Sequence, residues 1–287
     1  MTMEAAAKPG VGRTSWRFLR RNPTLVFGSL ILLAMVVVAI IAPLISADPL
    51  LMQPINRLKP PSAEFWLGTD ALGRDVFART IYGAQVSLLV GFAVAAIAMG
   101  AGLAIGLLAG YFRIVEAIIM RFLDGVMAIP AILLAIALVS LTGASVLVVI
   151  IAISIPETPR VVRLVRAVVL SVRERPYVEA AIAGGAPTWK VLIRHILPPT
   201  IPPLIVQATY ICASAILVEA ALSFLGAGVP PEIPTWGNMI SSSRLYVGLA
   251  PWTVFWPGLA LAIVVLAVNL VGDGLRDRLD PRIARRM

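Results

Sequence analysis

The chain has 287 residues, of which 59% are hydrophobic and only 14% are charged, and its formal net charge is +9. This charged fraction lies well below the roughly 25% that is usual in soluble domains. Several uncharged runs are long enough to cross a bilayer, which needs about 20 residues. We therefore predict an all-α, polytopic membrane protein without a separate soluble domain. The single cysteine, Cys212, excludes an intrachain disulfide.

The uncharged runs predict six membrane spans in chain order. We place them at about 24–46, 84–111, 116–141, 145–167, 200–226 and 252–272. The first apolar core exceeds the roughly 7–15 residues of a signal peptide, so we expect a retained helix. The six-span bundle 24–272 would then follow an N-terminal segment 1–23 and precede a C-terminal tail 273–287. A single span across 125–156 would instead give five spans, with the termini on opposite sides.

The basic residues predict the orientation of the spans. Under the six-span reading the outer segments hold only five of the 24 lysines and arginines, namely Arg57, Lys59, Arg74, Arg79 and Arg244. Because basic residues concentrate on the cytoplasmic side, we expect both termini in the cytoplasm. The positive charge thus indicates membrane topology and contact with anionic lipid rather than binding of nucleic acid.

A polar, arginine-flanked insert of about thirty residues separates the fourth and fifth spans. Pro176 suits a first helical turn, and Gly184 with Gly185 suits a helix end. A second short helix should begin at Pro187, with Trp189, Leu192, Ile193 and Ile196 on its apolar side, and end before Pro198 and Pro199. Four residues predict an apolar face on the first helix: Tyr177, Val178, Ala181 and Ile182. Such a helix pair lies on lipid headgroups or contacts a soluble partner.

The insert resembles the EAA loop of ABC importer permeases. It reads Glu179-Ala180-Ala181, then Gly185 after three residues, then Leu197-Pro198 after eleven more. Longer stretches resemble the C-type subunit of the dipeptide/oligopeptide/nickel branch: LVRAVVLSVRERPYVEAA (164–181), RHILP (194–198), LGTDALGRD (67–75), EAALSFLG (219–226) and GDGLRDRLDP (272–281). The general pattern has Ile where this chain has His195, which we interpret as a feature of the branch.

The resemblance implies the partners and the docking residues. An ATPase subunit would dock on Tyr177, Val178, Glu179, Ala180, Ala181, Ile182, Gly184 and Gly185. The implied assembly contains a second homologous permease, two ABC ATPases that use ATP and magnesium, and an extracytoplasmic substrate-binding protein. It would lie in the bacterial cytoplasmic membrane and import peptides or a related small solute.

The residues indicate no chemistry within this chain itself. None of the three lysines follows a glycine, so the Gly-Lys of a phosphate-binding loop is absent. We find no catalytic cluster, and one histidine makes no metal site, so we expect neither enzyme activity, metal nor cofactor. A self-sufficient secondary carrier is the alternative function, although such carriers usually show inverted repeats and several intramembrane charges.

Candidate residues for the pathway lie within the spans. Gly102, Gly106 and Gly110 recur at every fourth position, a spacing that serves either a pathway helix or simple helix packing. Glu219 is an acid within an apolar run, where it should be paired or face water. We expect a polar tie to a neighbouring helix, with a charged gate as the alternative. Glu157 should pair with Arg160 or Arg163.

The outer segments 48–79 and 227–251 predict the extracytoplasmic face. In the resembled family this face receives the binding protein, which makes Asp70, Arg74, Trp236 and Asn238 its candidate residues here.

Overall fold

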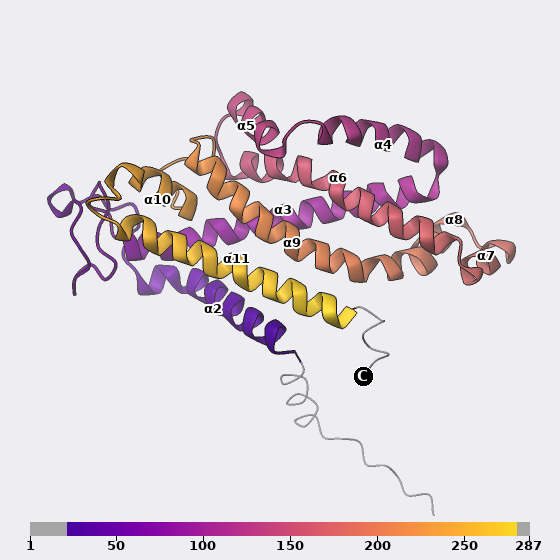
Figure 1. Ribbon diagram of the computed structural model, residues 1–287, viewed down its shortest axis with the longest axis horizontal. Helices are drawn as coiled ribbons and strands as arrows, with labels where there is room; N and C mark the ends of the chain where they lie inside the picture. The colour runs from indigo at the N-terminus through magenta and orange to yellow at the C-terminus, as the bar shows by residue number, and fades with distance from the viewer. Residues whose placement is uncertain (1–21, 280–287) are drawn as a thin grey trace, which may run out of the picture.

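The computed structural model describes residues 22–279, and the regular structure in this range is helical apart from one isolated bridge between Thr69 and Asp75. The helices form an elongated bundle (Figure 1). Its long helices are α2 (Pro23–Ile45), α3 (Val76–Tyr111), α6 (Val146–Arg173), α9 (Leu197–Phe224) and α11 (Trp252–Leu279). The shorter ones are α4 (Arg113–Met127), α5 (Ala131–Thr142), α7 (Pro176–Ala183), α8 (Thr188–Val191) and α10 (Trp236–Ser243).

Helix α3 is the axis of the bundle and packs against α2, α6 and α9. Its closest approach is to α6, along the three glycines Gly102, Gly106 and Gly110. A Cβ atom added at these positions would lie 2.4, 2.7 and 2.6 Å from the Cβ atoms of Val161, Val165 and Val169. Both series advance by four residues, so the two backbones meet along matching ridges with no room for a side chain on α3.

This contact predicts different outcomes for two glycines of one helix. Gly106→Val should force α3 and α6 apart and lower stability by about 1–3 kcal/mol, as in other overpacked cores. Gly100→Val is the matched control, because no atom lies within 4 Å of the position of its added Cβ. Thermal unfolding of the purified protein in detergent measures both. Equal melting temperatures for the two variants would contradict the packing role.

Within residues 22–279, four helices are long and apolar enough to cross a membrane: Pro23–Ile45, Val76–Tyr111, Thr188–Phe224 and Trp252–Leu279. They contain the second and sixth predicted spans, and all but the last one or two residues of the first and the fifth. The N-terminal segment 1–23 falls outside the described residues except for its last two, and of the tail 273–287 only 273–279 is described, as the end of α11.

The third predicted span, 116–141, is wrong as one continuous helix. It consists of α4 and α5, which meet at an angle of 85°. Pro130 explains the break, because proline disfavours the helical conformation in the residue before it and lacks the N–H that continues a helix. The alternative span across 125–156 is also wrong, since the chain leaves the helix at 128–130 and again at 143–145. If the bent pair counts as one span, the candidates number up to five.

Helix α6 covers the fourth predicted span but is not among these candidates, because three charges interrupt its apolar run: Glu157, Arg160 and Arg163. Arg160 pairs with Glu157 at 3.0 Å, as one of the two expected pairings has it. Arg163 pairs with Asp124 of α4 at 2.6 Å, and Arg166 donates from Nε to Glu116 of α4 at 2.7 Å. These pairs hold α4 against α6. The total of six spans stays a prediction.

The expected end of the second short helix before Pro198 and Pro199 is also wrong. Helix α8 continues through a π-helical turn, η2 (Leu192–Ile196), directly into α9. In this turn the Leu197 N–H donates to the Leu192 carbonyl, five residues back. This wider turn precedes Pro198 and Pro199. In a regular helix each proline would leave a carbonyl without its N–H donor, and its ring would clash with the carbonyl four residues back.

Candidate functional site

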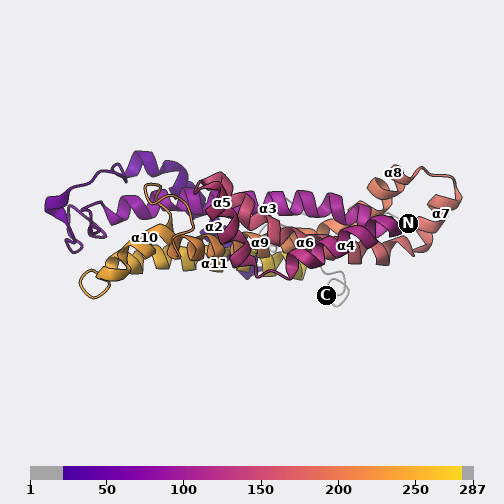
Figure 2. The same cartoon turned by 90° about the horizontal axis from the view of Figure 1, so that it is seen from above.

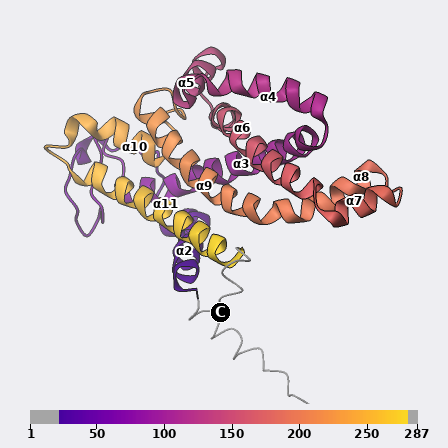
Figure 3. The same ribbon diagram turned by 45° about the vertical axis from the view of Figure 1, so that its right-hand side comes forward.

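The two regions singled out by the sequence lie at opposite ends of the bundle (Figure 2). The helices α7 and α8 project at one end. The segment between α2 and α3 lies at the other, together with α10 and the turn that leads into α11. The long helices connect the two ends, and α6 and α9 run directly into the α7–α8 hairpin (Figure 3).

The turn between α7 and α8 is built as predicted from the glycine pair. Pro176 occupies the first turn of α7. At the other end Gly185 adopts φ +76°, the left-handed conformation that glycine tolerates. The Ala186 N–H donates to the Ala181 carbonyl (3.1 Å) and the Gly185 N–H to the Ile182 carbonyl (2.9 Å). These two bonds make a Schellman cap, which turns the chain back toward the bundle.

The hairpin has a buried anchor and an exposed face. Val178, Val191 and Ile196 are fully buried and belong to the core cluster that includes the end of α6. Leu192 is partly buried and packs against the same cluster. Four large apolar side chains of the hairpin project outward, with exposed fractions from 44% to 64%: Tyr177, Ile182, Trp189 and Ile193. The apolar face predicted for α7 therefore has two parts. Val178 anchors the hairpin in the core, whereas Tyr177 and Ile182 are exposed. An open groove of about 470 Å³ lies beside α8 on the surface, lined by Trp189, Lys190, Ile193, Arg194 and Pro198.

His195 lies in the π-helical turn rather than in a loop. Its ring faces that of Tyr177 across 6.3 Å between centroids. Within residues 22–279 no group of three His, Cys, Asp or Glu side chains could hold a metal ion.

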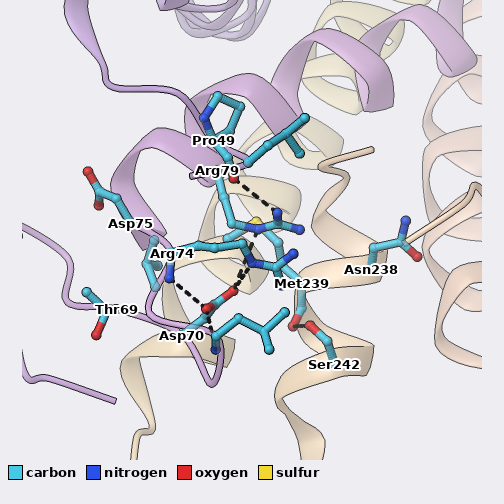
Figure 4. Close-up of polar contacts among 12 residues, drawn as sticks. Pro49, Thr69, Asp70, Arg74, Asp75, Arg79, Asn238, Met239 and Ser242 are labelled. Atoms are coloured by element: carbon cyan, nitrogen blue, oxygen red, sulfur yellow. Dashed lines mark hydrogen bonds and ion pairs between the residues drawn. The ribbon is translucent and has the colours of Figure 1, made fainter. Parts of the chain in front are cut away.

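The end of the bundle opposite the hairpin contains a buried charged cluster centred on Asp70 (Figure 4). One oxygen of Asp70 accepts from Arg74 Nε at 2.7 Å and lies 3.9 Å from Arg79 Nε. Its other oxygen accepts the backbone N–H groups of Leu72 and Arg74. Arg79 Nη1 also donates to the carbonyl of Pro49, which ties the segment after α2 to α3. Nearby, burial raises the pKa of the Asp75 carboxyl, which caps α3 by accepting the Phe77 N–H.

Helix α10 packs on α3 and α9 at the same end. Trp236 donates from its indole nitrogen to the carbonyl of Thr80 (3.0 Å), and the amide of Asn238 donates to the carbonyls of Val229 and Pro230. Gly237 allows the close approach, because an added Cβ would lie 2.6 Å from Cα of Ala220.

The four residues expected on the outer face therefore lie beneath a surface and not on it. Asp70, Arg74, Trp236 and Asn238 are all buried in this conformation, so they shape the outer segments from within rather than presenting their own side chains. Sequence reasoning missed Arg79 as a member of this group. The signal was available, because an arginine at the start of an apolar helix needs a nearby carboxylate.

Glu219 is fully buried in α9, directly beside the contact of α10. Ser223, one turn along the same helix, donates to Glu219 Oε1 at 2.8 Å. The second oxygen, Oε2, has no hydrogen bond within the described part of the chain. Ser223 lies on the same helix, and the side chain of Thr235, the residue that caps α10, also interacts with this carboxyl. The role of Glu219 stays a prediction.

Two substitutions separate the roles of Glu219. Glu219→Gln keeps an acceptor for Ser223 and should preserve assembly and most transport. Glu219→Leu removes the acceptor and should lower stability by about 1–3 kcal/mol, with a matching loss of assembled complex on size-exclusion chromatography. An assembled but inactive Gln variant would instead identify a charged gate.

Comparisons with known proteins agree with this architecture. Residues 102–285 match the family model of the binding-protein-dependent transport system inner membrane component, and residues 11–61 match the N-terminal transmembrane domain of oligopeptide transport permease C. The chain is 59% identical to the probable peptide ABC transporter permease protein y4tQ of Sinorhizobium fredii, across 99% of this chain and 98% of that protein. It is 44% identical to the dipeptide transport system permease protein DppC of Alkalihalophilus pseudofirmus, across 94% and 90%.

Among solved structures, an inward-facing MetNI methionine ABC transporter contains a chain with a TM-score of 0.55. The two are 20% identical, and the match covers 70% of this chain and 96% of that one. This likeness concerns the fold.

Long apolar helices carrying a projecting helical hairpin, with these relatives, define a permease subunit of an ABC importer, a multi-pass protein of the inner membrane. The chain belongs to the family of binding-protein-dependent transport system inner membrane components, in its dipeptide/oligopeptide branch.

Proposed function

We propose that this subunit forms half of a peptide translocation pathway, and that a second homologous permease supplies the other half. Two ATPase subunits, which bind ATP and magnesium, dock on the exposed face of the α7–α8 hairpin. An extracytoplasmic binding protein delivers the substrate, and the subunit itself catalyses no reaction. Both termini lie in the cytoplasm, and six spans cross the membrane.

The exposed face of the hairpin is the observation that carries this proposal. Four large apolar side chains project from a short structure whose anchoring residues are already buried: Tyr177, Ile182, Trp189 and Ile193. Glu179 lies beside them in the first turn of α7, a favourable place for an acidic residue. Exposed apolar surface rimmed by polar residues is characteristic of protein interaction sites.

The connections of the hairpin support coupling by rigid-body motion. Only Glu174 and Arg175 separate α6 from α7, and η2 joins α8 to α9 without a loop. A displacement of the hairpin by closing ATPases would therefore tilt α6 and α9 together. The α3 helix would follow α6, because the glycine–valine contact leaves no space between them.

The peptide assignment comes from the relatives. Their names include a probable peptide permease, a dipeptide permease and a D,D-dipeptide permease, and a glutathione permease is 39% identical. These solutes share a peptide backbone, which motivates peptides as the substrate class of this importer.

The glycine turn offers a test of the docking role. Gly185→Val places a β-branched residue at φ +76°, where a side chain is disfavoured by about 1–2 kcal/mol. The variant should insert and pair with its partner permease, yet lose the ATPase subunits and transport. Gly185→Asn is the control, since asparagine tolerates this conformation. Normal peptide uptake by the Val variant would refute the docking assignment.

The orientation has an independent test by thiol labelling. In a Cys212→Ala background, a cysteine at Leu249 should react with an impermeant maleimide added to intact cells, because this exposed residue lies at the proposed outer end. A cysteine at Lys190 should react only after permeabilisation. The opposite pattern would invert the proposed topology.

A further inference from the structure

An exposed arginine lies near the middle of α6. The helix runs from Val146 to Arg173, which places Arg160 about 20 Å from either end at a rise of 1.5 Å per residue. The side chain of Arg160 is 41% exposed. Helices α3 and α9 pack along α6, and both belong to helices that can cross a membrane. In the proposed six-span topology Arg160 therefore lies at the depth of the lipid tails, whose layer is roughly 30 Å thick.

The guanidinium of Arg160 is held at this depth by an ion pair. Its Nη1 donates to both oxygens of Glu157, at 3.0 and 3.1 Å, and the side chain of Ser214 in α9 also interacts with this carboxyl. Glu157 is buried and lies one turn nearer the start of α6, so the pair directs the arginine away from the hairpin end. A charged side chain inside a membrane faces a water-filled cavity or the interior of the protein. This face of α6 is therefore turned away from lipid.

An open groove continues the same face toward the hairpin. Helices α6, α9 and α11 lie side by side in that order (Figure 1). Between them is a groove of about 450 Å³, whose lining includes Leu164 of α6, Val206 and Gln207 of α9 and Arg276 of α11. Leu164 follows Arg160 by four residues, so the two side chains lie on one face of α6. The exposed arginine thus lies at one end of the groove.

Arg160 retains free hydrogen-bond donors. Glu157 engages Nη1 alone, and within residues 22–279 the Nε and Nη2 groups of Arg160 make no hydrogen bond. A guanidinium offers two parallel N–H groups to a carboxylate, in a geometry that matches the two carboxylate oxygens. The ion pair with Glu157 therefore fixes the arginine and leaves one side of it open to a second carboxylate.

The acidic groups near Arg160 are already paired. Glu157 is bound to Arg160 itself, and Asp124 of α4 is bound to Arg163. The far end of the groove has mixed charge, because Arg276 lies close in sequence to Asp273 and Asp277 of α11. Of the two arginines beside the groove, Arg160 is therefore the one suited to an additional anion.

We propose that this face of α6 lines the translocation pathway and that Arg160 binds the C-terminal carboxylate of the passing peptide. The groove then accepts the residues that precede this carboxylate. Peptides differ in their side chains but share a backbone and a terminal carboxylate, so a residue that serves many peptides has to recognise a shared group. The inference rests on the proposed function and adds the pathway face and the residue that contacts the substrate.

Thiol labelling tests whether the groove holds water. A thiol reacts as its thiolate, which is disfavoured in apolar surroundings. In a Cys212→Ala background, Val206→Cys in the nucleotide-free importer in nanodiscs should react with a charged thiol reagent at least tenfold faster than Leu33→Cys. Leu33 is the control because it is 60% exposed in the middle of the uncharged α2. Equal reaction rates at the two positions would overturn the pathway face.

Transport of two probe peptides tests the role of Arg160. Proteoliposomes containing the complete importer receive the same binding protein loaded with trialanine or with trialanine amide, which lacks the terminal carboxylate. Glu157→Gln/Arg160→Gln removes both charges, so that no buried carboxylate is left unpaired. This variant should lower the ratio of trialanine uptake to amide uptake about tenfold, as the loss of a charge-assisted hydrogen bond does. Because the binding protein is unchanged, a changed ratio belongs to the permease.

Two further variants keep the test decisive if that one does not assemble. Arg160→Lys preserves the charge and the pair with Glu157 but loses the planar fork, so it should lower the ratio at least threefold. Asp124→Asn/Arg163→Gln removes a pair of similar exposure from the same helix, since Arg163 is 44% exposed, and should leave the ratio unchanged. A wild-type ratio in the Arg160 variants would refute the carboxylate site. So would loss of the second permease from the Arg160→Lys complex, because Arg160 would then contact that subunit.

The same measurements separate this site from the proposed function. If the wild-type importer takes up trialanine and the Arg160 variants keep its ratio, the importer stands and the site is refuted. If the wild-type importer takes up neither peptide, the proposed peptide import itself fails.

Discussion

The close contact between α3 and α6 is the interaction on which the rest of the arrangement depends. Three valines of α6 pack directly against three glycines of α3, so side chains of one helix meet the backbone of the other. The ion pairs from Arg163 and Arg166 then hold α4 on the same helix. Because α6 leads into α7 within two residues, this contact also sets where the α7–α8 hairpin projects. A helix displaced here would displace both ends of the subunit.

The sequence predicts the parts of this fold that single residues decide locally. Uncharged runs locate α2, α3, α9 and α11, and the pair Gly184 and Gly185 locates the turn of the hairpin. Prolines show where local reasoning fails. Pro130 breaks the third span, whereas Pro198 and Pro199 continue a helix, because a π-helical turn precedes them. The difference lies in the hydrogen-bond register of the preceding turn, which the residue types do not specify.

The end of the bundle opposite the hairpin shows a second limit of prediction from sequence. Arg74 and Trp236 were expected on a surface because they lie in the two polar segments that, in the resembled family, receive the binding protein. Both are buried, because Asp70 neutralises the arginine and the Thr80 carbonyl satisfies the indole. The exposed positions are held instead by Ile55 and Leu245. Tertiary partners decide which polar group is buried, and those partners lie far away in the chain.

The π-helical turn between α8 and α9 determines how the side chains of α8 are rotated about the helix axis relative to those of α9. A π turn contains one residue more than an α turn, and one residue corresponds to about 100° of rotation. Trp189 and Ile193 therefore point in a direction that differs by that angle from the one a regular helix would impose. Loss of a single residue within Leu192–Ile196 would leave α9 and α8 intact as helices. It would nevertheless turn the exposed apolar face of the hairpin to another direction, so the number of residues in this segment matters as well as their types.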